Sequence, residues 1–187
     1  KHNVQRVMLI SSDKAVRPTN IMGATKRISE LIFLSHSLAH NKENATCFSI
    51  VRFGNVLGSS GSVVPLFKKQ ISKGGPITIT DKAMVRYFMT IEEASNLVIQ
   101  ASALAKSGEI LLLDMGDPIF IKTLAEKMIN LAGLKVKSNS EPKGDIEIIY
   151  TGLRPGEKLF EELLIDAEAI PTVNPLIFMA NEKPINL

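Results

Sequence analysis

The stretch VMLISSDKAVRPTNIMGATKRISELIFLSHSLA at residues 7–39 decides the fold. Its first five residues form a short apolar run that ends in small polar residues, which is typical of a buried strand. Residues 23–39 then place apolar side chains at helical spacing, at Ile28, Leu31, Ile32 and Leu38. A strand followed by a helix is the repeating unit of α/β proteins, so this stretch predicts a parallel sheet covered by helices.

The same alternation continues along the chain. We expect strands at 46–53, 109–114 and 146–150, helices at 63–73, 90–106, 121–132 and 159–165, and a proline-containing tail. Thr90 and Glu93 form a capping box at the start of one helix, and Gly133 follows the last apolar residue of another. These elements predict the α/β class, although a whole doubly wound domain would need more strands than the chain offers.

Composition excludes several classes of function. The 187 residues carry 22 Lys and Arg against 19 Asp and Glu, without a run of like charges, which favours a small anionic ligand over nucleic acid. Hydrophobic residues make up 45%, but no run approaches the length of a membrane span, so we expect a soluble polypeptide. The sequence begins with Lys1 and not Met, which suggests a piece of a longer protein.

The sequence predicts no metal site. Cys47 lies in an apolar stretch and is interpreted as a buried strand residue in a reducing, cytoplasmic compartment. The histidines His2, His36 and His40 form no ligand pattern with it, and the pair spaced by four residues lacks the acidic partner of a zinc helix.

The glycine fingerprint of dinucleotide-binding proteins is missing from the sequence. No G-x-G-x-x-G follows a first strand, and the glycine-rich loop at 58–62 has the wrong spacing. We therefore expect the N-terminal dinucleotide-binding half of such a fold to be absent, and any NADP or NAD to be bound mainly by that half.

Residues 11–27 follow the first strand, where the carboxyl ends of strands in open α/β sheets form ligand crevices. Asp13 and Lys14 are candidate acid and base at this position. The alternative is a solvated ion pair at a helix entry.

This segment resembles the active site of UDP-N-acetylglucosamine 4,6-dehydratases, bacterial surface-polysaccharide enzymes of the extended short-chain dehydrogenase family. Their pattern, Thr-Asp-Lys-Ala-Val-x-Pro-Thr-Asn-x-Met-Gly-Ala-Thr-Lys, differs here chiefly by Ser12 in place of Thr. Further matches are RFGNVLGSSGSVVP at 52–65, RYFMT at 86–90 and RPGEK at 154–158. The resemblance implies the C-terminal part of a Rossmann-type doubly wound parallel sheet at 1–62, and a mixed substrate-binding part at 63–187.

The resemblance also implies a mechanism. The sugar is oxidised at C4 by bound NADP, water is eliminated across C5 and C6, and the hydride returns to C6. Asp13 is then the elimination acid and Lys14 the C5 base, which requires a protonated carboxyl and a neutral amine. Lys26 matches the lysine of the family's Tyr-x-x-x-Lys motif, which holds the nicotinamide ribose.

Met22 occupies the tyrosine position of that motif. A thioether cannot accept a proton, so Ser12, Asp13 or a water molecule must assist removal of the C4 hydroxyl proton. Methionine at this position is similar to the longer, membrane-anchored members of the family, so we expect upstream membrane helices that anchor the complete protein to the cytoplasmic face of the inner membrane.

The ligand-binding residues are inferred from the same matches. Those expected at the cofactor are Ser11, Lys26, Phe53, Gly54 and Val56. Those expected at the UDP-sugar are Lys14, Asn55, Val64, Pro65, Lys68, Arg86, Arg154 and Glu157, with the two arginines on the phosphates and Glu157 on the uridine ribose.

Two classes of function remain open. The complete protein is expected to be an NADP-dependent dehydratase, or a related enzyme that also epimerises C5, while the chain by itself is a nucleotide-sugar-binding or structural fragment without activity. An ordinary 4-epimerase is disfavoured because those relatives lack the Asp-Lys pair and keep tyrosine. An apolar sheet edge left by the missing half favours homo-oligomers.

Overall fold

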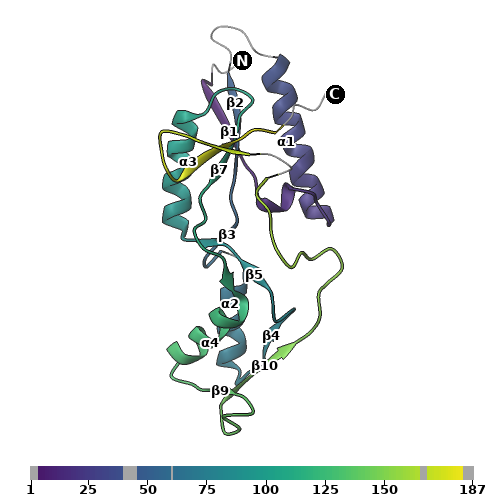
Figure 1. The fold of residues 1–187 in the computed structure, drawn as a ribbon, viewed down its shortest axis with the longest axis vertical. Coiled ribbons are helices and arrows are strands. Elements are labelled where there is room, and N and C mark those ends of the chain that lie inside the picture. The colour runs from purple at the N-terminus through teal and green to yellow at the C-terminus, as the bar shows by residue number, and fades with distance from the viewer. Residues whose placement is uncertain (1–3, 40–45, 60, 165–167, 183–187) are drawn as a thin grey trace. The chain divides into compact units, whose positions relative to one another are not determined.

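The computed structural model describes residues 4–39, 46–59, 61–164 and 168–182 (Figure 1). The chain forms two compact units: unit 1 comprises Lys1–Gly54, Glu92–Met115 and Glu161–Leu187, and unit 2 comprises Asn55–Ile91 and Gly116–Phe160. The predicted division near residue 62 is replaced by this interleaved one. The chain returns twice to unit 1 because strands from residues 110–113 and 169–180 complete its sheet.

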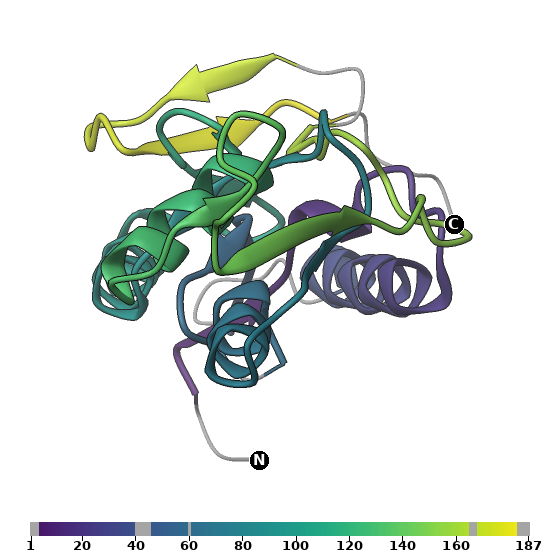
Figure 2. The same ribbon diagram turned by 90° about the horizontal axis from the view of Figure 1, so that it is seen from below.

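Unit 1 contains a five-stranded sheet in the order β1-β2-β7-β12-β11. The parallel strands β1 (Arg6–Ile10), β2 (Cys47–Arg52) and β7 (Ile110–Leu113) confirm the predicted α/β class with a parallel sheet. The predicted tail instead forms β11 (Ala169–Pro171) and β12 (Ile177–Ala180), which run antiparallel side by side in the yellow part of Figure 2. Strand β12 is antiparallel to β7, so the sheet is mixed at this end.

Helices α1 (Ile21–Ala39) and α3 (Ile91–Leu104) lie on opposite sides of the parallel strands (Figure 1). Both match predicted helices to within two residues. Phe33 and Leu34 of α1 pack against a buried cluster of Ile50, Ile110 and Leu112 on the sheet. Between β1 and α1, residues Asp13–Ala15 form a short 3-10 helix, η1, which carries the candidate acid and base.

Unit 2 packs helices α2 (Val63–Ser72) and α4 (Ile121–Leu131) against a parallel sheet of β4 (Ile77–Ile79), β10 (Ile146–Tyr150) and β9 (Val136–Lys137). Its core includes Phe67, Ile77, Ile129 and Ile146, which are all almost fully buried. Two short pairs complete the unit: β3 (Asn55–Val56) with β6 (Phe88–Met89), and β5 (Val85–Arg86) with β8 (Ile119–Phe120).

The helix predicted at 159–165 is wrong for residues 159–164, which are extended or bent, and Ile165 lies outside the described residues. Side chains from other elements bind carbonyls of this segment. Arg86 donates to the carbonyls of Lys158 and Leu159, which the predicted helix would use internally, and Arg52 donates to that of Leu163. The apolar spacing in this segment therefore reflects packing onto the core and not a helix.

Several further predictions concern features outside the core. Cys47 is half-buried in β2, with Sγ 3.6 Å from the carbonyl oxygen of Ala105, as a packed strand residue would be. His36 stacks on Phe48, whereas His2 and His40 lie outside the described residues. Within the described ranges, β1 pairs with β2 alone and so lies at the edge of its sheet. In the same ranges, no helix is long and apolar enough to cross a membrane.

An ion-pair network lies buried beside the sheet of unit 1. Arg52, at the end of β2, and Glu30, on α1, are both fully buried, with Nε–Oε1 and Nη2–Oε2 distances of 2.7 and 2.8 Å. Ser11 and Arg27 also donate to Glu30, and Glu182 accepts from Arg52 and Arg27. Fork-to-carboxylate geometry of this kind is needed to offset the cost of burying charge.

Burial and pairing act in opposite directions on these two groups. Burial opposes ionisation of Glu30, but its hydrogen bonds and charge interaction with Arg52, helped by Ser11 and Arg27, outweigh burial and lower its pKa below the ordinary value of 4.5. Burial likewise opposes the charge on Arg52, and its bonds to Glu30 and Glu182 outweigh it and raise the pKa of the guanidinium. Both groups are therefore ionised near neutral pH.

Helix α1 approaches η1 so closely that only glycine fits at the contact. A Cβ atom at Gly23 would lie well inside contact distance of the Lys14 carbonyl oxygen, and close to Pro18. The entry to α1 is fixed by Asn20, whose Oδ1 accepts from the Gly23 amide at 2.9 Å. This close approach sets the separation between η1 and the first turns of α1.

The lowered pKa of Glu30 predicts a defined acid sensitivity. Its contribution to the free energy of unfolding is fully present above about pH 4.5, and is lost as pH falls through the lower pKa of the folded state. Glu30→Gln should cost about 3–5 kcal/mol at pH 7 because it leaves Arg52 underpaired. Denaturant unfolding from pH 7 to pH 3 should show the difference from wild type narrowing only at the acid end. Glu126→Gln, in a surface pair with Lys122, is the control and should cost little at any pH.

The close approach at Gly23 predicts a steric effect. Gly23→Ala should lower the free energy of unfolding by about 1–3 kcal/mol because α1 must move away from the Lys14 carbonyl. Thr25, two residues further along α1, is exposed. Thr25→Ala removes only the hydrogen bond from Thr25 Oγ1 to the Met22 carbonyl, and should lower the free energy of unfolding by about 0.5 kcal/mol or less. Equal losses for the two variants, measured by thermal unfolding, would contradict the steric account.

Candidate active site

The residues predicted as acid and base form a hydrogen-bonded group at the carboxyl end of β1. Asp13 is 1% exposed, and its Oδ1 accepts from Lys14 Nζ at 2.8 Å and from Ser12 Oγ at 2.7 Å. Ser12 also caps η1, since its Oγ accepts from the Lys14 amide. Asp13 Oδ2 is buried, and no hydrogen-bond partner for it is found among the described residues. A buried carboxyl beside an amine and a hydroxyl is suited to moving protons.

Helix α1 contributes the next two predicted residues. Lys26 is partly buried, and its Nζ donates to the carbonyl of Ile10 at 3.2 Å, at the end of β1. Met22, one turn earlier, is 48% exposed. The helix therefore anchors the Lys26 ammonium at the strand end that leads into Ser12 and Asp13.

The end of β2 supplies the neighbouring backbone. The ladder between β1 and β2 continues past both strands, with Ser11 N donating to Val51 O at 2.8 Å and Asp13 N to Phe53 O at 3.2 Å. Gly54 N contacts the sulfur of Met115 at 3.3 Å. The predicted cofactor residues Ser11, Lys26, Phe53 and Gly54 thus all belong to unit 1 and adjoin the acid-base group, whereas Val56 belongs to unit 2.

Glu161, which sequence reasoning did not single out, also faces the acid-base group. Its side chain is only 6% exposed, and Oε1 lies 3.9 Å from Lys14 Nζ. The adjacent Glu162 is 46% exposed and pairs with Arg17 at 3.2 Å. The sequence holds a weak signal for Glu161 as a site residue, because it is the third residue after the RPGEK block.

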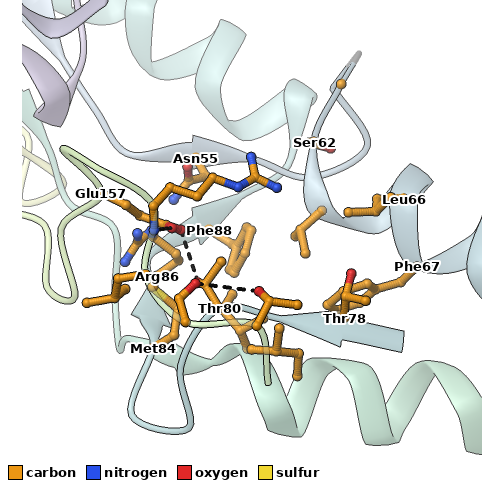
Figure 3. A pocket seen from close by; sticks show the side chains of 18 of the residues that line it. Asn55, Ser62, Leu66, Phe67, Thr78, Thr80, Met84, Arg86, Phe88 and Glu157 are labelled. Carbon is orange, nitrogen blue, oxygen red and sulfur yellow. Dashed lines mark hydrogen bonds between the residues drawn. The ribbon is translucent and has the colours of Figure 1, made fainter. Parts of the chain in front are cut away.

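Unit 2 carries a separate cavity of about 660 Å³, within the usual range of about 300–1,000 Å³ for ligand pockets. Figure 3 shows Asn55, Arg86, Phe88 and Glu157 around it, with Thr80 bonded to Glu157. Of the predicted substrate residues, Asn55, Arg86, Arg154 and Glu157 line this cavity. Ser62, Thr78 and Thr80 also line it and were not predicted.

Residues 154–157 form a tight turn at the cavity. Glu157 N donates to Arg154 O at 3.0 Å, and Gly156 has a φ of +75°, as a turn with proline before glycine requires. Glu157 is held by Thr80 Oγ1 and by the Arg154 amide, one on each carboxylate oxygen. Arg86 donates to three backbone carbonyls, those of Val85, Lys158 and Leu159, so it anchors the chain that follows this turn.

The remaining predicted substrate residues lie on α2. Val64 and Pro65 belong to its first turn but do not line the cavity, which is instead lined from this helix by Val63, Leu66 and Phe67. Lys68 lines a different hollow, between α2 and α4, together with Ile71, Met128 and Leu134. The structure therefore separates Lys68 from the group formed by Asn55, Arg86, Arg154 and Glu157.

The buried ion pair was also missed, although a signal for it exists. Glu30 is followed at helical spacing by Phe33, Leu34 and Ser37, and this is the face of α1 that packs on the sheet. The apolar spacing from which the helix was predicted marks another face, on which Ile28, Ile32 and Leu38 are exposed. A buried carboxylate needs a partner, and the buried Arg52 in the next strand supplies it.

Comparison with known proteins agrees with the motifs. Residues 1–182 match the family described as "Polysaccharide biosynthesis protein". The capsular polysaccharide biosynthesis protein CapD of Staphylococcus aureus is 54% identical over 168 residues, which cover 90% of this chain and 26% of that protein. A UDP-N-acetylglucosamine 4,6-dehydratase (inverting) of Campylobacter jejuni is 36% identical over 88% of this chain and 45% of that protein. A UDP-glucose 4-epimerase of Rickettsia canadensis is 34% identical over 88% of this chain and 45% of that protein.

Solved structures agree on the fold. The structure of Pen from Bacillus thuringiensis has a TM-score of 0.81 and 38% identity, and covers 95% of this chain and 53% of that one. A dTDP-glucose 4,6-dehydratase of Streptomyces venezuelae, solved with NAD, has a TM-score of 0.68 at 19% identity, over 82% of this chain and 49% of that one.

The chain thus spans about a quarter of CapD and about half of the other proteins compared. The match over residues 1–182, together with the relatives above, confirms the resemblance found in the motifs. This chain belongs to the polysaccharide biosynthesis protein family.

Proposed function

We propose that the complete protein containing this chain is a nucleotide-sugar 4,6-dehydratase that converts UDP-N-acetylglucosamine to a UDP-4-keto-6-deoxy sugar. The observation that carries the proposal is the ion pair between the buried Asp13 and the partly exposed Lys14, with 2.8 Å between Oδ1 and Nζ. Elimination of water across C5 and C6 needs an acid and a base that act on adjacent atoms, and this pair supplies both on consecutive residues. The dehydratase relative in Campylobacter jejuni supports the same reaction class.

The cofactor residues in unit 1 suit a nicotinamide dinucleotide. Lys26 Nζ donates one hydrogen bond to Ile10 O, and an ammonium has two further N–H donors that can bind ribose hydroxyls. We propose that Ser11, Lys26, Phe53 and Gly54 contact the nicotinamide end, and that residues outside this sequence bind the rest. When bound, NADP or NAD supplies the hydride acceptor at C4 and the donor at C6.

The hydrogen bond from Ser12 to Asp13 suggests how the C4 hydroxyl is deprotonated despite methionine at position 22. We propose that Ser12 Oγ accepts the proton from the C4 hydroxyl while it passes its own proton to Asp13 Oδ1, 2.7 Å away. Asp13, now a neutral acid, delivers that proton to the C6 hydroxyl as it leaves as water. Lys14 removes the C5 proton and later delivers a proton to C5, after its amine protons have exchanged with solvent. Each proton taken from the sugar is thereby balanced by one delivered to the sugar or to the departing water.

We propose that the cavity of unit 2 binds the UDP moiety. Arg154 lines it and is exposed, so its guanidinium is available to phosphate oxygens, and Asn55 and Glu157 offer polar atoms for the nucleoside. A second proposal, a binding module without turnover, is favoured for the chain by itself because its sequence lacks G-x-G-x-x-G. We place the complete protein in the cytoplasm, with any membrane anchor outside these residues.

The dehydratase proposal predicts a labelled product. Incubating the complete protein with UDP-N-acetylglucosamine in deuterated water should give a 4-keto-6-deoxy sugar with deuterium at C5. Proton NMR measures the formation of this product. Lys14→Ala should lower its formation by about a hundred-fold or more because the C5 base is lost. Lys122→Ala, on the exposed face of α4, should leave it unchanged. Binding without conversion would support the binding module, and inversion at C4 alone would support a 4-epimerase.

The proposed phosphate contact predicts a change in affinity. Arg154→Gln should weaken UDP binding by about ten-fold, and should reduce the loss of affinity with added salt, because one charged hydrogen-bond donor is removed. Calorimetric titration with UDP at two salt concentrations measures both quantities. Arg86→Gln should in addition lower the melting temperature because three backbone carbonyls lose their donor. Unchanged affinity in Arg154→Gln would remove this arginine from the site.

A further inference from the structure

We propose that Glu161 accepts the proton of the Lys14 ammonium, so that Lys14 becomes a neutral base while Asp13 holds the proton of the C4 hydroxyl. The observation is that the side chains of two carboxylates shielded from solvent lie near Lys14 Nζ, at 2.8 Å for Asp13 and 3.9 Å for Glu161. The proposed transfer of a proton from Lys14 to Glu161 during catalysis rests on the proposed dehydratase function. The contact between Glu161 and Lys14 does not depend on that function.

A count of protons shows why a second carboxylate is needed. A lysine side chain is ordinarily an ammonium, which carries no lone pair with which to remove a proton from C5. Asp13 can hold only one proton, and the C4 hydroxyl supplies it through Ser12. The ammonium proton therefore needs another acceptor. Transfer to Glu161 turns Lys14–NH₃⁺ and Glu161–COO⁻ into Lys14–NH₂ and Glu161–COOH, and leaves the total number of protons unchanged.

The geometry of Asp13 fits its part of this scheme. Its Oδ1 already accepts two hydrogen bonds, while Oδ2 is buried and has no partner within the described part of the chain. An ionised carboxylate with one buried oxygen left without a donor is costly, so neutralising Asp13 by the proton that Ser12 passes to Oδ1 is favoured. Once protonated, Asp13 no longer competes for the proton of Lys14.

The backbone that carries Glu161 is fixed from several sides. Arg52, from the buried ion pair, donates to Leu163 O at 3.3 Å, and Leu163 and Leu164 pack against the core of unit 1. Glu162 points outward to Arg17. These contacts on the residues that follow it hold the backbone of Glu161 in place, with its Oε1 3.9 Å from Lys14 Nζ.

The charged groups around Lys14 fall into two sets. Asp13 and Glu161 face its Nζ directly, from η1 and from the segment after residue 160. The nearby charges are engaged elsewhere: Lys26 with Ile10 O, Arg17 with Glu162, and Glu30 with Ser11 and Arg52. Removing the charge of Glu161 therefore changes the surroundings of Lys14 and leaves those other pairs in place.

The catalytic test uses the complete protein with UDP-N-acetylglucosamine in deuterated water, and follows two steps separately. In Glu161→Gln, reduction of the bound cofactor should stay within about two-fold of wild type, while deuterium entry at C5 slows by about ten-fold or more. Raising the pH should restore C5 exchange, because hydroxide then takes the Lys14 proton. Glu162→Gln is the matched control and should resemble wild type in both steps.

A second measurement needs no substrate. The acetylation rate of Lys14 by acetic anhydride, read by peptide mass spectrometry at a fixed pH, should be several-fold higher in Glu161→Gln than in wild type or Glu162→Gln, because in the free protein the ammonium then has one carboxylate neighbour fewer. This readout reports only the contact between Glu161 and Lys14 without substrate. With substrate bound, the same change leaves the ammonium proton without its acceptor, which is what slows C5 exchange. Lys14 is 26% exposed and so within reach of the reagent.

The outcomes separate the two proposals. Unchanged acetylation in Glu161→Gln overturns the inference, as does an equal loss of cofactor reduction and C5 exchange at every pH, which indicates a structural role. A wild-type protein that neither reduces its cofactor nor exchanges C5 overturns the dehydratase proposal instead, and the acetylation rates then still decide whether Glu161 controls the charge of Lys14.

Discussion

The buried pair of Arg52 and Glu30 is the interaction on which the active-site half of the structure depends. The guanidinium of Arg52 joins strand β2, helix α1, the carboxylate of Glu182 and the carbonyl of Leu163. Glu30 in turn accepts from Ser11, the residue before the acid-base group. Breaking a buried pair is costly because the remaining charge has no solvent, so this network holds five separate chain segments in one arrangement. Those segments carry Ser12, Asp13, Lys14, Lys26 and Glu161.

The sequence allowed most of this arrangement to be predicted wherever a local signal exists. The strand at 146–150 has the predicted bounds, and α1, α2, α3 and α4 lie within two residues of theirs, because apolar period, capping box and glycine stop all act within a few residues. The segment at 159–164 has an apolar pattern too, but its carbonyls are bound by Arg86 and Arg52 from distant strands. Long-range bonds of that kind leave no local trace, and the predicted helix there was wrong for this reason.

Candidate site residues divide along the same line. The motif identified Asp13, Lys14 and Lys26, and the structure brings them to one end of β1 because strand, turn and helix are consecutive in the chain. Lys68 was assigned by the resemblance of its motif to the family, yet it lines the hollow that α4 residues also line. Since a shift of one position on a helix turns a side chain by about 100°, a motif match does not fix the face of α2 on which Lys68 lies. Glu161 is some 147 residues from Lys14, and only the fold brings the two side chains together.

The contrast between Glu161 and Glu162 shows how the fold gives neighbouring residues of the same type different chemistry. Glu162 is half-exposed, so solvent screens its pair with Arg17 and either partner could be replaced at little cost. Glu161 is shielded from solvent beside an ammonium that already has a carboxylate partner, so the group of three carries a net negative charge when all are ionised. Burial makes a third charge in this group unfavourable, and this is the physical basis on which we propose Glu161 as the acceptor for the Lys14 proton.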